Sequence, residues 1–112
     1  INHLKSLFLQ KKQRMEKNEI LHIVLDTIQK FTSNNGIDVN GEINHEQRLI
    51  GKSGIFDSMD LVNFLVDLEE VLEERYDKVI SLQDERAMSR SHSPFLNPEE
   101  LTKFILELNE DE

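Results

Sequence analysis

Apolar residues recur at helical spacing in the first long stretch of the chain, residues 17–32. The positions that define this pattern are spaced by four, four and three: Ile20, Val24, Ile28 and Phe31. Such spacing places them on one face of a helix and predicts that this face is buried. The four residues that follow are expected to stop this helix, because Asn and Gly accept the left-handed conformation that ends helices. They are Ser33, Asn34, Asn35 and Gly36. One helix is therefore expected over residues 17–32.

A second helix is expected from about residue 58 to residue 74, a stretch without Gly or Pro. Asp57 can cap its start, and Asp60 places a carboxylate in the first turn, where it is favourable. One apolar face of this helix is the expected core face: Leu61, Phe64, Leu65, Leu68 and Leu72. A second apolar stripe, rotated by roughly 140°, consists of Met59, Val62 and Val66. Two interpretations stay open: the stripe packs under a neighbouring segment, or it faces solvent and docks partners.

Two further helices complete the predicted fold. A short one is expected around residues 80–88, starting near Ser81. The last begins with Asn97 as N-cap and Pro98 at the first helical position, with Glu100 placed to support the cap. Its buried face is expected from Leu101, Phe104, Ile105 and Leu108. No strand pattern competes. We therefore expect an all-α bundle of three main helices and one short helix, with a long loop, residues 33–57, between the first two.

Apolar residues of the 33–57 loop are candidates for the core: Ile37, Val39, Ile43, Leu49, Ile50 and Phe56. The first fourteen residues differ in composition from the rest, and Met15 is a candidate translation start. We divide the chain into a basic, flexible extension, residues 1–14, and one folded domain, residues 15–112. An alternative for the extension is an amphipathic segment that touches a membrane or a partner through Ile1, Leu4, Leu7 and Phe8.

The charge is distributed unevenly along the 112 residues. The chain carries 13 basic and 22 acidic residues, and its net charge is −9. Residues 1–14 hold +4 and residues 15–112 hold −13. Such a field repels nucleic acid and favours basic protein surfaces. The chain has no Cys, which excludes disulfides and zinc–thiolate sites. Because no signal peptide or membrane span is evident, a cytoplasmic monomer without stable membrane insertion is expected.

The candidate chemistry lies at Asp57, Ser58, Met59 and Asp60, where the loop meets the second helix. A helix start offers unpaired N–H groups and a positive dipole end, so a serine there can carry a phosphodiester. A serine hydrolase is disfavoured because the Gly-x-Ser-x-Gly motif is missing.

A calcium site in residues 36–47 is also disfavoured. This segment has Asp38, Asn40 and Gly41 at the right spacing but lacks the first Asp and the last Glu of a calcium loop. The four His residues are scattered without metal-ligand spacing: His3, His22, His45 and His92. Neither feature predicts a metal site.

In its motifs the chain resembles the acyl carrier proteins over roughly residues 16–110. The family hallmark, Asp-Ser-Leu at the start of the second helix, appears here as Asp57-Ser58-Met59. An acidic helix with a Glu pair follows, here Glu69 and Glu70. Two departures are Met59 in place of Leu, as in some specialised carriers, and Asn63 where fatty-acid carriers usually have Glu. They favour a dedicated pathway over housekeeping fatty-acid synthesis.

The resemblance implies a carrier rather than an enzyme. Ser58 would receive a 4′-phosphopantetheine arm from coenzyme A, added by a magnesium-dependent phosphopantetheinyl transferase that recognises Asp57. The arm would hold an acyl or aminoacyl group as a thioester, for fatty-acid, polyketide or specialised lipid biosynthesis, and a cleft beside the second and third helices would shelter it. Partners would be an acyl-activating ligase and acyl-transfer or synthase enzymes with basic surfaces. Their implied contacts are Met59, Asp60, Val62, Val66, Glu69 and Glu70. The alternative is an acidic helical interaction module whose serine is not modified.

Overall fold

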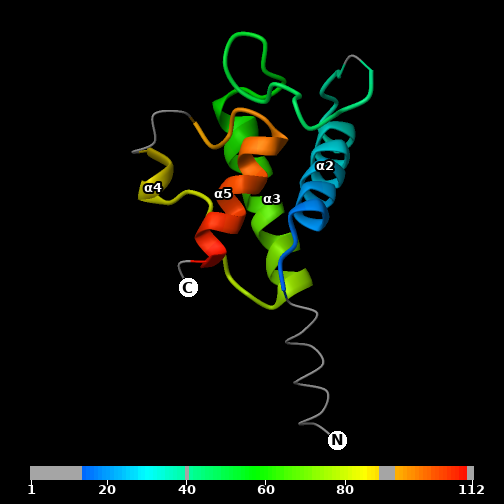
Figure 1. The fold of residues 1–112 in the computed structure, drawn as a ribbon. Helices are drawn as coiled ribbons and strands as arrows, with labels where there is room; N and C mark the ends of the chain where they lie inside the picture. The colour runs from blue at the N-terminus through cyan, green and yellow to red at the C-terminus, as the bar shows by residue number, and fades with distance from the viewer. Residues whose placement is uncertain (1–13, 40, 89–92, 111–112) are drawn as a thin grey trace, which may run out of the picture.

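The computed structural model describes residues 14–39, 41–88 and 93–110, without the side chains of Arg86 and Met88. It contains three long helices and one single turn: α2 (Lys17–Asn34), α3 (Ser58–Tyr76), α4 (Glu85–Met88) and α5 (Pro98–Glu110) (Figure 1). The described residues form no strand, which confirms the prediction of an all-α protein. Within these residues, no helix is both long enough and apolar enough to cross a membrane.

Helix α2 packs against both α3 and α5, and the apolar faces expected from the sequence are the ones that meet. The residues of α2 and α5 that were expected to be buried all are, and Ile23 joins them. On α3 four of the five expected core residues are buried, namely Phe64, Leu65, Leu68 and Leu72. Leu61 is partly buried against this core. The helical periodicity therefore identified the correct side of each long helix.

Helix α2 continues to Asn34, two residues beyond its predicted end, but the capping residues near the end of α2 and at the start of α5 are among those expected from the sequence. The Asn97 side chain accepts a hydrogen bond from the Glu100 N–H (2.8 Å) at the start of α5. At the end of α2, the Asn35 N–H donates to the Phe31 carbonyl (3.0 Å), and Gly36 takes the left-handed conformation with a φ of 65°. A side chain disfavours that conformation, so a glycine is the natural residue there.

The start predicted for the short third helix is wrong, because residues 81–84 are not helical. Ile80 and Leu82 are buried in the core, and the Leu82 N–H donates to the Glu69 carboxylate (2.7 Å). Residues 80–82 are therefore held by burial in the core and by a hydrogen bond to Glu69 of α3, without forming a helix. The single turn α4 follows, and the Ala87 N–H donates to the Asp84 carbonyl (3.0 Å).

Helices α2 and α3 run antiparallel. The Tyr76 hydroxyl, at the end of α3, donates to the Glu19 carboxylate (2.7 Å) in the first turn of α2. Burial and this hydrogen bond raise the pKa of the Tyr76 hydroxyl above its usual range. At the opposite end, Phe31 of α2 contacts Phe56, just before α3 (5.4 Å between ring centroids). Met15 is buried with this core, whereas the predicted extension lies outside the described residues except for Arg14.

The segment between α2 and α3, described except for residue 40, is tied to the rest of the fold by its backbone. The Leu49 N–H donates to the Leu96 carbonyl (2.8 Å), and the Glu99 N–H of α5 donates to the His45 carbonyl (3.0 Å). Leu49 and Phe56 are buried, while Ile37, Ile43 and Ile50 are partly buried against the core. This segment therefore approaches α3 along a defined path and positions its first residue.

Candidate functional site

Ser58 is the first residue of α3, and it is exposed. Two residues earlier the Phe56 ring is buried, with its centroid 5.4 Å from that of Phe31 and 5.1 Å from that of Phe64. Phe31 and Phe64 also contact each other edge to face (6.0 Å). Three rings from α2, α3 and the segment between them thus hold the chain immediately before Ser58. The serine is exposed, yet the backbone that carries it is anchored in the core.

A tight turn leads into this anchor. The Gly54 N–H donates to the Gly51 carbonyl (3.1 Å), and the Ile55 and Phe56 N–H groups donate to the carbonyls of Arg48 (3.2 Å) and Leu49 (2.9 Å). Gly51 has a φ of 86°, a conformation that L side chains rarely adopt. The backbone of residues 48–56 therefore forms a hydrogen-bonded turn that leads directly to Ser58 at the start of α3.

Asp57 and Asp60 form a reciprocal capping box around Ser58. The Asp57 side chain accepts from the Asp60 N–H (2.8 Å), and the Asp60 side chain accepts from the Asp57 N–H (3.2 Å). Among the described residues, the Ser58 hydroxyl has no hydrogen-bond partner, and the N–H groups of Ser58 and Met59 have no acceptor. The site thus combines an accessible hydroxyl with two unpaired donors at the positive end of a helix.

The second apolar stripe of α3 faces solvent. Met59, Val62 and Val66 are 73%, 45% and 42% exposed, so the interpretation in which the stripe is packed away is wrong. Exposed carboxylates border it along the helix: Asp67, Glu70, Glu73 and Glu74. We call these seven residues the α3 face. This face starts beside Ser58 and combines an exposed apolar strip with four negatively charged carboxylates.

Glu69 and Glu70, an adjacent pair in the sequence, have different surroundings. The Glu69 carboxylate is partly buried and accepts the Leu82 N–H (2.7 Å), which fixes the segment between α3 and α4. Glu70 is exposed. The sequence gives no sign of this difference, because the partner of Glu69 lies thirteen residues away.

We expect Glu69→Ala to lower the free energy of unfolding by about 1–2 kcal/mol, because it leaves the Leu82 N–H without its charged acceptor. Glu70→Ala is the matched control and should change stability by less than about 0.5 kcal/mol. Urea denaturation followed by circular dichroism measures both values. Equal stabilities of the two variants would contradict the structural role of Glu69.

A groove of about 330 Å³ lies one helical turn beyond Ser58. Its lining comes from α3, α4 and the residues on either side of α4: Leu61, Val62, Leu65, Gln83, Asp84, Glu85, Ala87 and Phe95. Phe95 is held edge to face on Phe104 of α5 (6.1 Å between ring centroids). Phe95 and Ala87 were not among the site residues expected from the sequence, because no local pattern marks them. The lining residues from α3 are all apolar, and the polar ones, Gln83, Asp84 and Glu85, come from the start of α4 and the residues before it.

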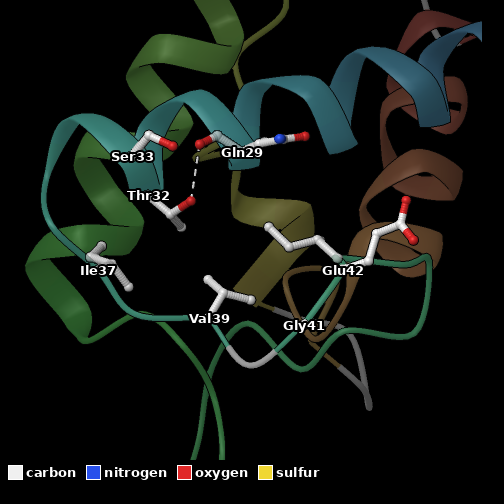
Figure 2. Close-up of a pocket in the computed structure, with 8 residues that line it drawn as sticks. Gln29, Thr32, Ser33, Ile37, Val39, Gly41 and Glu42 are labelled. Atoms are coloured by element: carbon white, nitrogen blue, oxygen red, sulfur yellow. Dashed lines mark hydrogen bonds between the residues drawn. The ribbon is translucent and has the colours of Figure 1, made fainter.

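The segment that resembles a calcium loop lines a different cavity, at the far end of α2. This cavity of about 310 Å³ is lined by residues of α2 and of the segment that follows it. Figure 2 shows Gln29, Thr32 and Ser33 on α2, with Ile37, Val39, Gly41 and Glu42 on the neighbouring segment. The Thr32 hydroxyl donates to the Gln29 carbonyl (3.0 Å). Within the described residues, no group of three His, Cys, Asp or Glu residues is placed to hold a metal ion.

The chain was compared with models of protein families, with curated proteins and with solved structures, and none of these comparisons gives a match. Any functional assignment therefore depends on the residues described above. The feature with the clearest chemistry is Ser58 at the start of α3, with the α3 face on one side and the apolar groove close by.

Proposed function

We propose that the protein is an acyl carrier of the four-helix type and that Ser58 bears a 4′-phosphopantetheine arm. The observation that carries this proposal is the setting of Ser58: an exposed hydroxyl at the first position of α3, with the preceding Phe56 ring buried in the core. A long arm needs an attachment point that is open to enzymes and yet fixed in position. Ser58 meets both requirements.

The residues around Ser58 fit a phosphodiester. The N–H groups of Ser58 and Met59 have no acceptor within the described part of the chain, and the helix dipole favours an anion at this end. The Asp57 carboxylate receives the Asp60 N–H (2.8 Å), so it is engaged in the cap rather than directed at the serine hydroxyl. When attached, the arm supplies a thiol that holds the cargo as a thioester, and the chain supplies position and recognition.

The two neighbouring surfaces suit the remaining tasks of a carrier. The groove along Leu61 and Leu65 offers apolar surface for the cargo close to the attachment point. The α3 face offers apolar side chains for contact and carboxylates that attract basic surfaces of a transferase, a ligase or a synthase. Met59, the most exposed of the apolar side chains on this face, is flexible and adapts to differently shaped partners. We assign it, with Asn63, to recognition by the enzymes of one dedicated pathway.

The direct test is a change in mass. The purified chain is incubated with coenzyme A, magnesium and a broad-specificity phosphopantetheinyl transferase, and its intact mass is measured. We expect the addition of one phosphopantetheine group and complete loss of that addition in Ser58→Ala. Ser53→Ala is a matched control, because Ser53 is an exposed serine in the turn five residues earlier, and this variant should be modified at the parent rate.

Two results would overturn the proposal. If several transferases leave the mass of the folded chain unchanged, Ser58 is not an attachment site, and an acidic helical interaction module with an unmodified serine becomes the better description. If the addition persists in Ser58→Ala, the arm is attached elsewhere and the setting of Ser58 has another purpose. Circular dichroism of each variant shows whether the helices are intact.

A further inference from the structure

We propose that the basic segment of this chain, residues 1–13, docks on the α3 face and covers part of it. The segment contains Lys5, Lys11 and Lys12 without any acid, and apolar residues at positions 1, 4, 7, 8 and 9. The α3 face presents the complementary combination, a solvent-exposed apolar strip bordered by carboxylates. The acyl-carrier assignment does not account for the segment.

The start of α2, which follows this segment in the chain, lies beside the C-terminal end of α3. Glu19, in the first turn of α2, accepts a hydrogen bond from Tyr76 (2.7 Å) and pairs with Arg75 (3.7 Å) at the end of α3. Met15 is buried in the same core. The residues before Arg14 therefore start close to the last turn of α3, where the exposed carboxylates of Glu73 and Glu74 lie.

Residues 1–13 have the reach to run along the α3 face. An α-helix of 13 residues is about 20 Å long, and a fully extended segment spans about 43 Å. From Tyr76 back along α3, Val66 lies about 15 Å away and Val62 about 21 Å away. The segment is thus long enough to cover the face as far as Val62, one turn short of Ser58.

The carboxylates of the α3 face are available for this contact. Asp67, Glu70, Glu73 and Glu74 form no ion pair with other described residues, whereas nearby cations are engaged: Lys30 pairs with Asp26 (3.0 Å), and Arg75 with Glu19. A tethered segment also has an effective concentration in the millimolar range. Weak ionic and apolar contacts are therefore sufficient to keep it docked at low salt, where screening is small.

Docking of this kind has a consequence that rests on the proposed function. A transferase or other basic partner that needs Val62, Val66 and Glu70 has to displace the segment first. The chain would then regulate access to its own recognition surface, and partners that bind the segment as well would gain an advantage.

The test uses a nitroxide label in the chain of residues 1–112. Because the protein has no Cys, Ser6→Cys provides a single attachment point. We expect the label to weaken the amide NMR signals of Val62, Val66 and Glu70 strongly, and those of α5 little. The additional changes Lys11→Glu and Lys12→Glu, or 0.5 M salt, should restore the weakened signals. Signals that remain at full intensity in the labelled parent chain would overturn the proposal.

Two further arms identify other occupants. Labelled, unenriched protein is mixed with ¹⁵N-enriched parent, and weakening in this mixture means that the segment reaches a second copy. In the second arm, anionic vesicles are added. If the α3 signals weaken only after this addition, the segment needs a lipid surface. Either result overturns docking within one chain.

The link to function is measured separately as the rate of arm loading, with Lys11→Glu/Lys12→Glu against the parent at low salt. We expect loading at least about twofold faster in the variant, because the recognition face is no longer covered. Label effects without any loading of Ser58 would refute the carrier function and leave the docking intact. Loading at equal rates, with clear label effects, would refute only the regulatory consequence.

Discussion

Replacing Phe56 by Ala should destabilise the domain by about 3–5 kcal/mol, a large part of the stability of a small domain. The ring is 5% exposed and contacts both Phe31 and Phe64, with centroids 5.4 Å and 5.1 Å away. Its removal leaves a cavity between α2 and α3 that the remaining rings cannot fill. Urea denaturation monitored by helical circular dichroism gives the difference directly.

A conservative variant separates the effect on the fold from the effect on the site. Phe56→Leu keeps most of the buried volume and should lose less than about 1.5 kcal/mol, so the domain stays folded. We nevertheless expect slower arm loading, since Ser58 lies only two residues from the altered anchor. Val79→Ala, at a side chain that is 68% exposed, is the control and should alter neither stability nor loading. A stability loss of Phe56→Ala no greater than that of Val79→Ala would show that the aromatic cluster does not hold this segment.

Gly54→Ala should also be strongly destabilising, at about 3 kcal/mol or more, because the added methyl group overlaps backbone atoms. A Cβ at this position would lie 2.5–2.6 Å from the Ile50 backbone, closer than real contacts allow. A flexible side chain can move aside, but here the turn itself would have to open. Since that turn ends at Phe56 and Ser58, both stability and arm loading should fall.

Gly41→Ala is the matched control for this prediction. Gly41 has a positive φ of 76°, but nothing lies within 4 Å of an added Cβ. The loss of stability in Gly41→Ala comes from backbone strain alone and is about 1–2 kcal/mol. Part of it is offset, because alanine restricts the conformations of the unfolded chain. Differential scanning calorimetry should therefore rank Gly54→Ala well below Gly41→Ala in melting temperature. The reverse order would contradict the close backbone approach at residue 54.

The predictions confirmed at the level of secondary structure share one property, namely that the determining residues are close in sequence. The cap of Asp57 on the Asp60 N–H spans three residues, and the same holds for Asn97 and Glu100. The start of the third helix was misplaced because a distant group, Glu69, takes the Leu82 N–H. A local sequence pattern does not show that a carboxylate thirteen residues away binds this N–H group.

At the candidate site, too, the sequence determined the local features and tertiary structure determined the contacts between distant residues. The sequence alone identified Ser58 at a helix start and two apolar stripes on the same helix, because helical periodicity is a local property. It did not determine whether the second stripe is covered as well, because that depends on where α2, α5 and the segment around α4 pack. Tertiary structure left Met59, Val62 and Val66 in solvent, engaged Glu69 but not Glu70, and placed Phe95 and Ala87 in one groove with Leu61. Residues far apart in the chain become neighbours only when burial of the core brings them together.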